Sequence, residues 1–432
     1  MSTKKRIFYG WILLVALVII GGIGPMTRYS VSAFFPDLSQ DLNWSRSLIG
    51  TAQSVSLWVY SFVSILTGLM IDRIGGRKVV LFGGIICLIG WLLLSTMNSI
   101  WQLFLYYGGV MGIAISFTHL VCVQSISRKW FVKKAGLAGG IVGSAFAVGT
   151  SIFSPLMTAL AADYGWRNVS LVAAFLSGIP IILLALFVIK DTPESVGLTP
   201  DGGPPAAFSP QAGINDKHWT VREALKTRQF WLLFISYSLT GVVYNGIIGH
   251  IVIWAVDLGS SAAVAGIFVT LFNGPSVAAR ILGGMMGDWH GKQKILIIGT
   301  AMSLVVALFG FFGVASSAIL TVFIIIIGLV AGFSNTLFAP YLGDLYGRNN
   351  VGSLFGILTL GWGLIGGVGP LLWGRIYDWT GGYQIALLIS VVCYTAALAA
   401  VCLIRPLQKP VTARSTLTLP KSRARQNSVV IS

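Results

Sequence analysis

The stretch GLMIDRIGGRK at residues 68–78 returns in degenerate form as GMMGDWHGKQK at residues 284–294. The aspartates of the two copies, Asp72 and Asp288, lie 216 residues apart. Other pairs keep this offset to within one residue: Gly75 and Gly291, Gly136 and Gly352, Gly140 and Gly356, Pro155 and Pro370, Asp163 and Asp378. Independent positions that agree so closely indicate a duplicated unit, and the chain is long enough for one copy in each half.

Composition indicates what the unit is made of. The chain has 432 residues, of which 55% are hydrophobic and 10% charged, and its mean hydropathy is +0.84. An average soluble domain has about 25% charged residues. So few charges cannot form a polar surface, which excludes a soluble enzyme, a disordered chain and a nucleic-acid-binding domain.

Long apolar runs predict membrane-spanning helices, since about 20 such residues cross the hydrocarbon core. Twelve are expected, near residues 8–35, 47–72, 79–97, 101–127, 135–162, 168–190, 229–256, 261–287, 293–314, 318–346, 351–377 and 383–404. The fold class predicted is therefore an all-α membrane protein with six helices in each half.

The polar segments divide the chain into four parts. Residues 1–190 and 229–404 are predicted to form the two six-helix bundles, and the Pro-rich residues 191–228 a cytoplasmic linker. The linker ends in an amphipathic segment from Trp219 to Gln229 that is expected along the membrane surface. Residues 405–432 are basic and rich in Ser and Thr, and are expected to be a disordered cytoplasmic tail.

Basic residues fix the expected orientation. If both termini are cytoplasmic, all but five of the 29 lysines and arginines fall on the cytoplasmic side, as positively charged inner segments require. Three fall outside and two, Arg28 and Arg280, lie within helices. The net charge of +16 thus reports topology and not nucleic-acid binding. A multi-pass protein of the cell (inner) membrane is predicted.

The loop at residues 68–78 joins the second and third predicted helices and resembles the signature loop of the major facilitator superfamily. Gly76 departs from the pattern, because many members carry a basic residue there. Weaker matches at YGW (9–11), RKWF (128–131) and YGWR (164–167) resemble the branch of monocarboxylate porters and oxalate:formate antiporters. The resemblance implies two pseudo-symmetric six-helix bundles that alternate access to a central site.

Residues of the repeated loop are predicted to latch the bundles together. Asp72 at a helix end is suited to accept hydrogen bonds from the N-terminal amides of a neighbouring helix and from Arg73 or Arg77. Asp288 is its copy in the second half. Such contacts would hold one conformation and release in the other. The alternative is a solvated turn whose charges serve topology.

Arg280 is the sharpest candidate for a binding residue. It lies within an apolar helix and stays charged at any reachable pH, so it needs an anion. The residue one turn earlier is Ser276 and not an acid, which makes a substrate carboxylate the predicted partner. The resemblance implies an essential arginine on helix 8, but the aspartate that often precedes it by four residues is absent. Snorkelling to the interface is the alternative.

Asn273 and Ser276 lie on the Arg280 face by helical spacing and are predicted to hydrogen-bond the substrate, or else to join helices. Arg28 and Tyr29 lie late in helix 1, near the outer leaflet. The resemblance implies that a basic residue in this stretch captures substrate, with snorkelling as the alternative for Arg28.

His119 and His250 are the membrane-embedded groups that titrate near neutral pH, so they are candidates for proton coupling and substrate binding. The alternative for each is a neutral histidine bonded to a carbonyl. Asn245, Asn335 and Tyr341 are further candidates for the cavity wall, and Asn335 is the repeat counterpart of His119. Aromatic packing alone would also explain Tyr341.

The leading interpretation is a proton-coupled secondary transporter of small monocarboxylates such as lactate or pyruvate, acting as a monomer in the lipid bilayer. An oxalate:formate-type antiporter would need a second deep cation, and predicted helix 11 has only Arg375, at its end. An exporter of a larger organic anion and a non-transporting membrane sensor stay open beside these two. No metal or cofactor site is expected from the four cysteines, and no enzyme motif is present; the coupling species would be a proton or a counter-anion.

Overall fold

The computed structural model describes residues 8–28, 34, 38, 41, 42, 44, 46–202, 219–314, 316–405 and 407. All regular secondary structure among these residues is helical. Within the same residues, twelve helical segments are long and apolar enough to cross a membrane, which confirms the predicted fold class. Tyr29, residues 203–218 of the expected linker and the tail beyond residue 407 lie outside the described residues.

The first bundle contains the helices that precede the linker. They are α1 (Tyr9–Arg28), α4 (Arg46–Ile74), α5 (Gly76–Ser95), α6 (Ile100–Gln102), the π-helix η1 (Leu103–Met111), α7 (Gly112–Thr118), α8 (Leu120–Trp130), α9 (Ala135–Tyr164) and α10 (Trp166–Phe187).

The second bundle contains the helices that follow the linker. They are α12 (Arg228–Asp257), α13 (Ala262–His290), α14 (Lys292–Gly313), α15 (Ser317–Asn335), α16 (Phe338–Tyr346), α17 (Val351–Leu364), α18 (Val368–Thr380) and α19 (Gln384–Cys402).

The outer surface of both bundles is apolar. Large side chains such as Phe187 and Phe312 are 71% and 80% exposed. Such exposure would be a liability in water, but lipid tails are as apolar as these side chains. The outer surface is therefore suited to face a bilayer.

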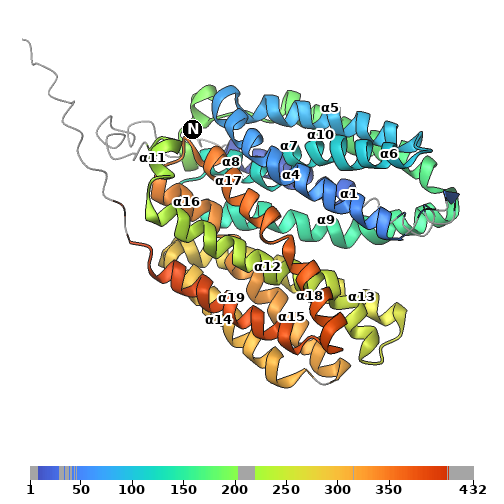
Figure 1. Ribbon diagram of the computed structural model, residues 1–432. Helices are drawn as coiled ribbons and strands as arrows, with labels where there is room; N and C mark the ends of the chain where they lie inside the picture. The colour runs from blue at the N-terminus through green and yellow to red at the C-terminus, as the bar shows by residue number, and fades with distance from the viewer. Residues whose placement is uncertain are drawn as a thin grey trace, which may run out of the picture.

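The bundles meet closely at the end of the molecule that holds the N-terminus and diverge toward the other end (Figure 1). There α4 packs along α17, and α9 along α13. A Cβ on Gly68 would collide with the carbonyl oxygen of Gly352, and one on Gly136 with that of Gly284. The repeated glycines therefore let helices of opposite bundles cross at contact distance.

Three of the expected helices are interrupted, which the apolar runs did not predict. One break separates α17 from α18 at residues 365–367, and the other two are related by the repeat. At His119, between α7 and α8, the backbone leaves the helical region (φ −101°, ψ −153°). At Thr336 and Leu337, between α15 and α16, the chain makes a turn. The two breaks fall at equivalent places of the repeat, and irregular backbone at membrane depth is tolerated where it lines a cavity.

The linker is bound to both bundles. The side chain of Asp201 accepts hydrogen bonds from the backbone N–H groups of residues 132–134 at 2.8–3.3 Å. Asp191 accepts one from the backbone N–H of Arg77 at 2.8 Å. The segment expected along the membrane surface forms only the single turn α11 (Val221–Ala224). Trp219 and Ala224 are buried in the core of the second bundle, so the amphipathic pattern is explained by packing on protein.

Candidate functional site

Two adjoining cavities lie at the bundle interface. The deeper one is small, about 80 Å³, and the wider vestibule is about 540 Å³. Arg28, Tyr60 and Asn245 line both. The other residues of the deep cavity come from both bundles: His119, Leu120, Gln124, Phe146, Tyr237, Tyr244, Arg280, Asn335, Thr336, Ala339, Phe355, Thr359 and Trp362.

Arg280 on α13 reaches from the second bundle toward α9 of the first. Its side chain is 8% exposed, and one Nη donates a long hydrogen bond of 3.4 Å to the carbonyl oxygen of Gly143. Its buried Nε has no partner. Among the described residues no ion pair joins Arg280 to a carboxylate, and none of the residues lining the deep cavity is acidic. A buried cation in this position is suited to bind an anion.

Asn273 and Ser276 do not line either cavity, although helical spacing placed them on the Arg280 face. The amide of Asn273 donates to the carbonyl oxygen of Val269 at 3.0 Å, and the hydroxyl of Ser276 donates to that of Asn273 at 2.6 Å. Ser276 also abuts Gly332 on α15. In this conformation the long arginine reaches the cavity, and Ser276 lies at the contact between α13 and α15, as the alternative of joining helices expects.

The two histidines differ in their surroundings. His119, at the break between α7 and α8, is 5% exposed and lines the deep cavity, and neither ring nitrogen has a hydrogen-bond partner. Its ring packs edge-on against Phe146, with 4.8 Å between ring centroids. His250 lines neither cavity; its Nε2 lies 2.9 Å from the carbonyl oxygen of Pro370 and its Nδ1 3.2 Å from the hydroxyl of Tyr383. His250 thus matches the alternative of a satisfied core histidine.

Arg28, Asn245 and Asn335 all lie on cavity walls. The guanidinium of Arg28 stands 5.4 Å from the ring centroid of Tyr60, and the hydroxyl of Tyr107 donates to the Arg28 carbonyl oxygen at 2.5 Å. The buried Oδ1 of Asn335 has no partner. Tyr341 lines neither cavity and is buried in the core of the second bundle, so packing accounts for it.

The structure adds wall residues that sequence reasoning missed, among them Tyr60, Gln124, Tyr237, Thr336 and Trp362. Tyr237 precedes Tyr244, another wall residue, by seven residues, a spacing that returns to the same helix face. Thr336 directly follows Asn335. Nothing in the local pattern distinguishes Tyr60 or Trp362 from the other aromatic residues of the membrane segments.

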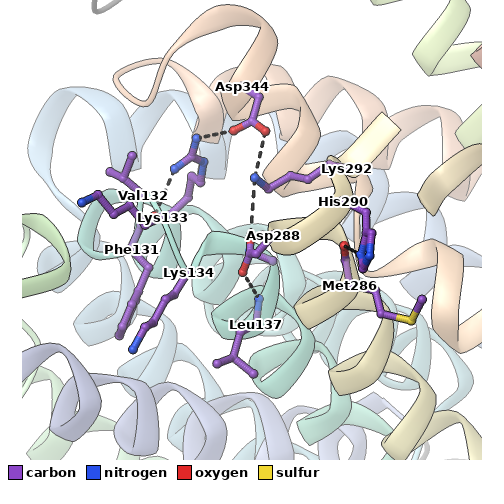
Figure 2. Close-up of polar contacts among 12 residues, drawn as sticks. Phe131, Val132, Lys133, Lys134, Leu137, Met286, Asp288, His290, Lys292 and Asp344 are labelled. Carbon is purple, nitrogen blue, oxygen red and sulfur yellow. Dashed lines mark hydrogen bonds and ion pairs between the residues drawn. The ribbon is translucent and has the colours of Figure 1, made fainter. Parts of the chain in front are cut away.

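The end of the molecule near the N-terminus is closed by two equivalent contacts. Asp72 on α4 accepts hydrogen bonds from the backbone N–H and hydroxyl of Ser353, at 2.7 and 2.6 Å. Asp288 on α13 accepts from the backbone N–H groups of Gly136 and Leu137, at 2.7 and 2.8 Å (Figure 2). Each carboxylate thereby caps the first turn of a helix in the opposite bundle, where the helix dipole favours negative charge.

The expected role of the loop arginines is wrong in this conformation. The guanidinium of Arg77 donates to the carbonyl oxygens of Ala185 and Leu186, at 3.1 and 2.7 Å, at the end of α10. Arg73 is exposed. Among the described ion pairs, the cation nearest Asp72 is Lys129, at 3.9 Å. Arg77 points away from the bundle interface, so both of its contacts stay within the first bundle.

A network of ion pairs reinforces the closed end. Asp344 on α16 accepts from Arg128 of the first bundle and from Lys292 of the second, each at 2.8 Å (Figure 2). Arg128 and Lys292 are 6% and 9% exposed. Glu194 and Arg348 form a more exposed pair, also at 2.8 Å. Partial burial disfavours the charged form of Glu194, but hydrogen bonds from its own backbone N–H and from Arg348 hold the pKa of its carboxyl below the usual value.

Two pseudo-symmetric six-helix bundles, closed at one end around a central polar cavity, define a secondary-transporter fold. The family model of the Major Facilitator Superfamily matches residues 17–261 and 246–429, and the chain belongs to that family. Like its relatives, it is a transporter and not an enzyme.

The chain is similar to characterised relatives over nearly its full length. It is 24% identical to the oxalate:formate antiporter of Oxalobacter formigenes over 401 residues, covering 91% of each protein. It is 25% identical to mouse monocarboxylate transporter 2 over 403 residues, covering 87% of this chain and 80% of the relative. The solved structure of the Escherichia coli fucose:proton symporter FucP superposes with a TM-score of 0.67 at 14% identity, covering 91% of this chain and 99% of FucP. The predicted resemblance is confirmed.

Proposed function

We propose that the protein is a secondary active transporter of small monocarboxylates, lactate- or pyruvate-like, and that Arg280 binds the carboxylate. The observation that carries the proposal is the buried Arg280 guanidinium, which faces the deep cavity without a carboxylate among the described residues. The kinship with monocarboxylate transporters and an oxalate:formate antiporter supports an anionic cargo.

The closed end supports an alternating-access cycle. The latch carboxylates, Asp72 and Asp288, bond across the bundles at the end near the N-terminus. If that end is cytoplasmic, as the basic loops favour, the vestibule opens to the outside of the cell membrane. Substrate would enter through the vestibule, bind Arg280, and leave after the latch contacts break. A monomer suffices for this cycle.

Proton coupling, if present, is best assigned to His119 or to the substrate carboxyl group. His119 lines the deep cavity, whereas His250 lies outside it. A proton on His119 or on the substrate would change the net charge of the substrate-loaded cavity. In an exchanger, a bound counter-anion would change that charge instead.

A second candidate function is the exchange of organic dianions. The absence of a deep cation on helix 11 argued for one charge per substrate, but Arg28 on α1 lines the same deep cavity as Arg280. Two cations facing one cavity favour a substrate with two anionic groups, or an exporter of a larger anion that extends into the vestibule. Arg28→Ala would then abolish uptake of a dicarboxylate, and would only slow the capture of a monocarboxylate.

Uptake into proteoliposomes tests the proposal. Arg280→Ala is expected to lower the initial rate of labelled lactate uptake by at least about 100-fold, because a charge-assisted pair is lost; Arg280→Lys should retain part of it. Arg375→Ala, which removes an exposed arginine, is the matched control. Uptake by Arg280→Ala at the wild-type rate would contradict the assignment of Arg280 to the binding site. Uptake at the same rate with and without a pH gradient would exclude proton symport.

A further inference from the structure

Five buried polar atoms of residues that line the deep cavity have no hydrogen-bond partner. They belong to four residues: Nδ1 and Nε2 of His119, Nε of Arg280, Oδ1 of Asn335 and Oγ1 of Thr336. More than about 90% of buried polar groups in folded proteins are bonded. So many unmet groups around one small cavity describe the polar pattern of a missing solute.

The two repeat-related helix breaks present three of these four residues. His119 forms the break between α7 and α8, and Asn335 is the last residue of α15, directly before Thr336 in the break between α15 and α16. The breaks are equivalent in the repeat and lie in opposite bundles. A solute in the cavity would therefore be contacted from both bundles at positions distinct from the arginine on α13.

The chemistry of these atoms specifies more than a carboxylate. Arg280 only donates hydrogen bonds, which suits a carboxylate, but Oδ1 of Asn335 only accepts. A neutral His119 has one donor and one acceptor nitrogen. A 2-oxo acid or a simple fatty acid anion brings acceptors alone and would leave the Asn335 oxygen unmatched. A solute that carries a hydrogen-bond donor beside its carboxylate would match the Asn335 oxygen.

The donor is better a hydroxyl than an ammonium group. Arg28 and Arg280 both line the cavity, and none of the described residues on its wall is an aspartate or glutamate that would balance an added positive charge. The volume of about 80 Å³ also restricts the solute, because pockets for drug-sized ligands measure about 300–1,000 Å³. A short chain with one hydroxyl fits both conditions.

We propose that the deep cavity selects short 2-hydroxy monocarboxylates over their 2-oxo and deoxy analogues, with His119 and Asn335 as the residues that recognise the hydroxyl group. The proposal rests on the proposed function, in which Arg280 binds the carboxylate. A site built to bond a substrate hydroxyl rejects the analogue that lacks it, because its own buried groups are then left unpaired.

Competition in proteoliposomes tests this selection. Uptake of labelled lactate is inhibited with unlabelled lactate, pyruvate or propionate, and the half-inhibiting concentrations are compared. For the wild type, lactate should be about tenfold to 100-fold more potent than propionate, and pyruvate should resemble propionate. His119→Phe and Asn335→Leu should bring these ratios to about one, as expected when a selective hydrogen bond is removed.

Two further variants separate recognition from loss of structure. His119→Gln keeps one donor and one acceptor and should retain most of the lactate preference. His290→Phe alters an exposed histidine outside both cavities and should leave the ratios at their wild-type values. Binding is also measured in detergent, as the shift of unfolding temperature with lactate or propionate, so that variants too slow for uptake still give a ratio.

The outcomes distinguish hydroxyl selection from the proposed carboxylate transport on which it rests. If the wild type takes up carboxylates but does not discriminate lactate from propionate, the hydroxyl selection falls and the carboxylate transporter stands. Selection that persists unchanged in both His119→Phe and Asn335→Leu would overturn the assignment to these residues. If no carboxylate binds or moves, both proposals fall together.

Discussion

The bundle interface has two polar regions, and their buried groups are satisfied to different degrees. At the closed end, both oxygens of Asp288 accept backbone N–H groups, and both oxygens of Asp344 bind cations. In the deep cavity, the guanidinium of Arg280 has one long bond and the ring of His119 has none. The closed end also leaves buried atoms without a hydrogen-bond partner, Oδ1 of Asp72 and Nε of Arg128, but fewer than the five of the residues around the small deep cavity. Stability and function are therefore expected to respond in opposite ways to substitutions in the two regions.

The largest effect is expected at the closed end. Asp344→Leu would remove the carboxylate that Arg128 and Lys292 share, and leave both cations buried. Removing one partner of a fully buried pair costs about 3–5 kcal/mol. Asp344 is 37% exposed and Lys292 keeps Asp288 at 3.5 Å, so a loss at or below the low end of this range is expected. Chemical unfolding in detergent should show this loss, and Arg128→Met in the same chain should restore part of it. Glu194→Gln, at an exposed pair, should cost less than about 1 kcal/mol. Equal losses in the two single variants would contradict the distinction.

A smaller effect of opposite sign is expected in the cavity. Arg280→Met replaces a buried cation that lacks a carboxylate partner by an apolar chain of similar length, so ligand-free protein should gain about 1–2 kcal/mol of stability. The same variant should lose the rise in unfolding temperature that lactate gives the wild type. Arg375→Met is the control for removal of an exposed arginine. A destabilised Arg280→Met protein would show that this arginine serves the fold.

The most local effect is expected at the latch carboxylates. Asp288→Asn should speed amide hydrogen exchange at Gly136 and Leu137, and Asp72→Asn should do so at Ser353, because a charged acceptor is lost. About tenfold is expected for a loss of 1.4 kcal/mol. Each variant is the control for the other, because in each one exchange should rise only at the helix terminus that the substituted aspartate caps. Exchange that rises at both termini in either variant would instead indicate that the whole end opens together.

The fold was largely predictable from sequence because local sequence features determine its helices and its repeat. Apolar runs of spanning length gave the twelve helices, and the offset between Asp72 and Asp288 gave the duplication. The breaks near His119 and Thr336 were not predictable, because no proline or glycine marks residues 118–120 or 335–337. Local propensity therefore does not mark these two breaks.

The cavity was predictable in part. Arg280, Arg28, His119, Asn245 and Asn335 line it, and a charge or polar group within an apolar run was the signal for each. Residues such as Asn273 and His250 carry the same signal but point into a bundle. A sequence gives the spacing of residues around a helix, but the rotation of the helix toward the cavity is set by its neighbours in three dimensions.

The bond between Arg128 and Asp344 has an implication for the history of the chain. The two residues are 216 positions apart and therefore occupy the same place in the two repeats. In a symmetric dimer of a single half, a residue that meets its own copy on the two-fold axis faces an identical side chain. Two arginines or two aspartates there would repel. This contact requires two halves whose sequences can differ, so it arose after the duplication that produced them.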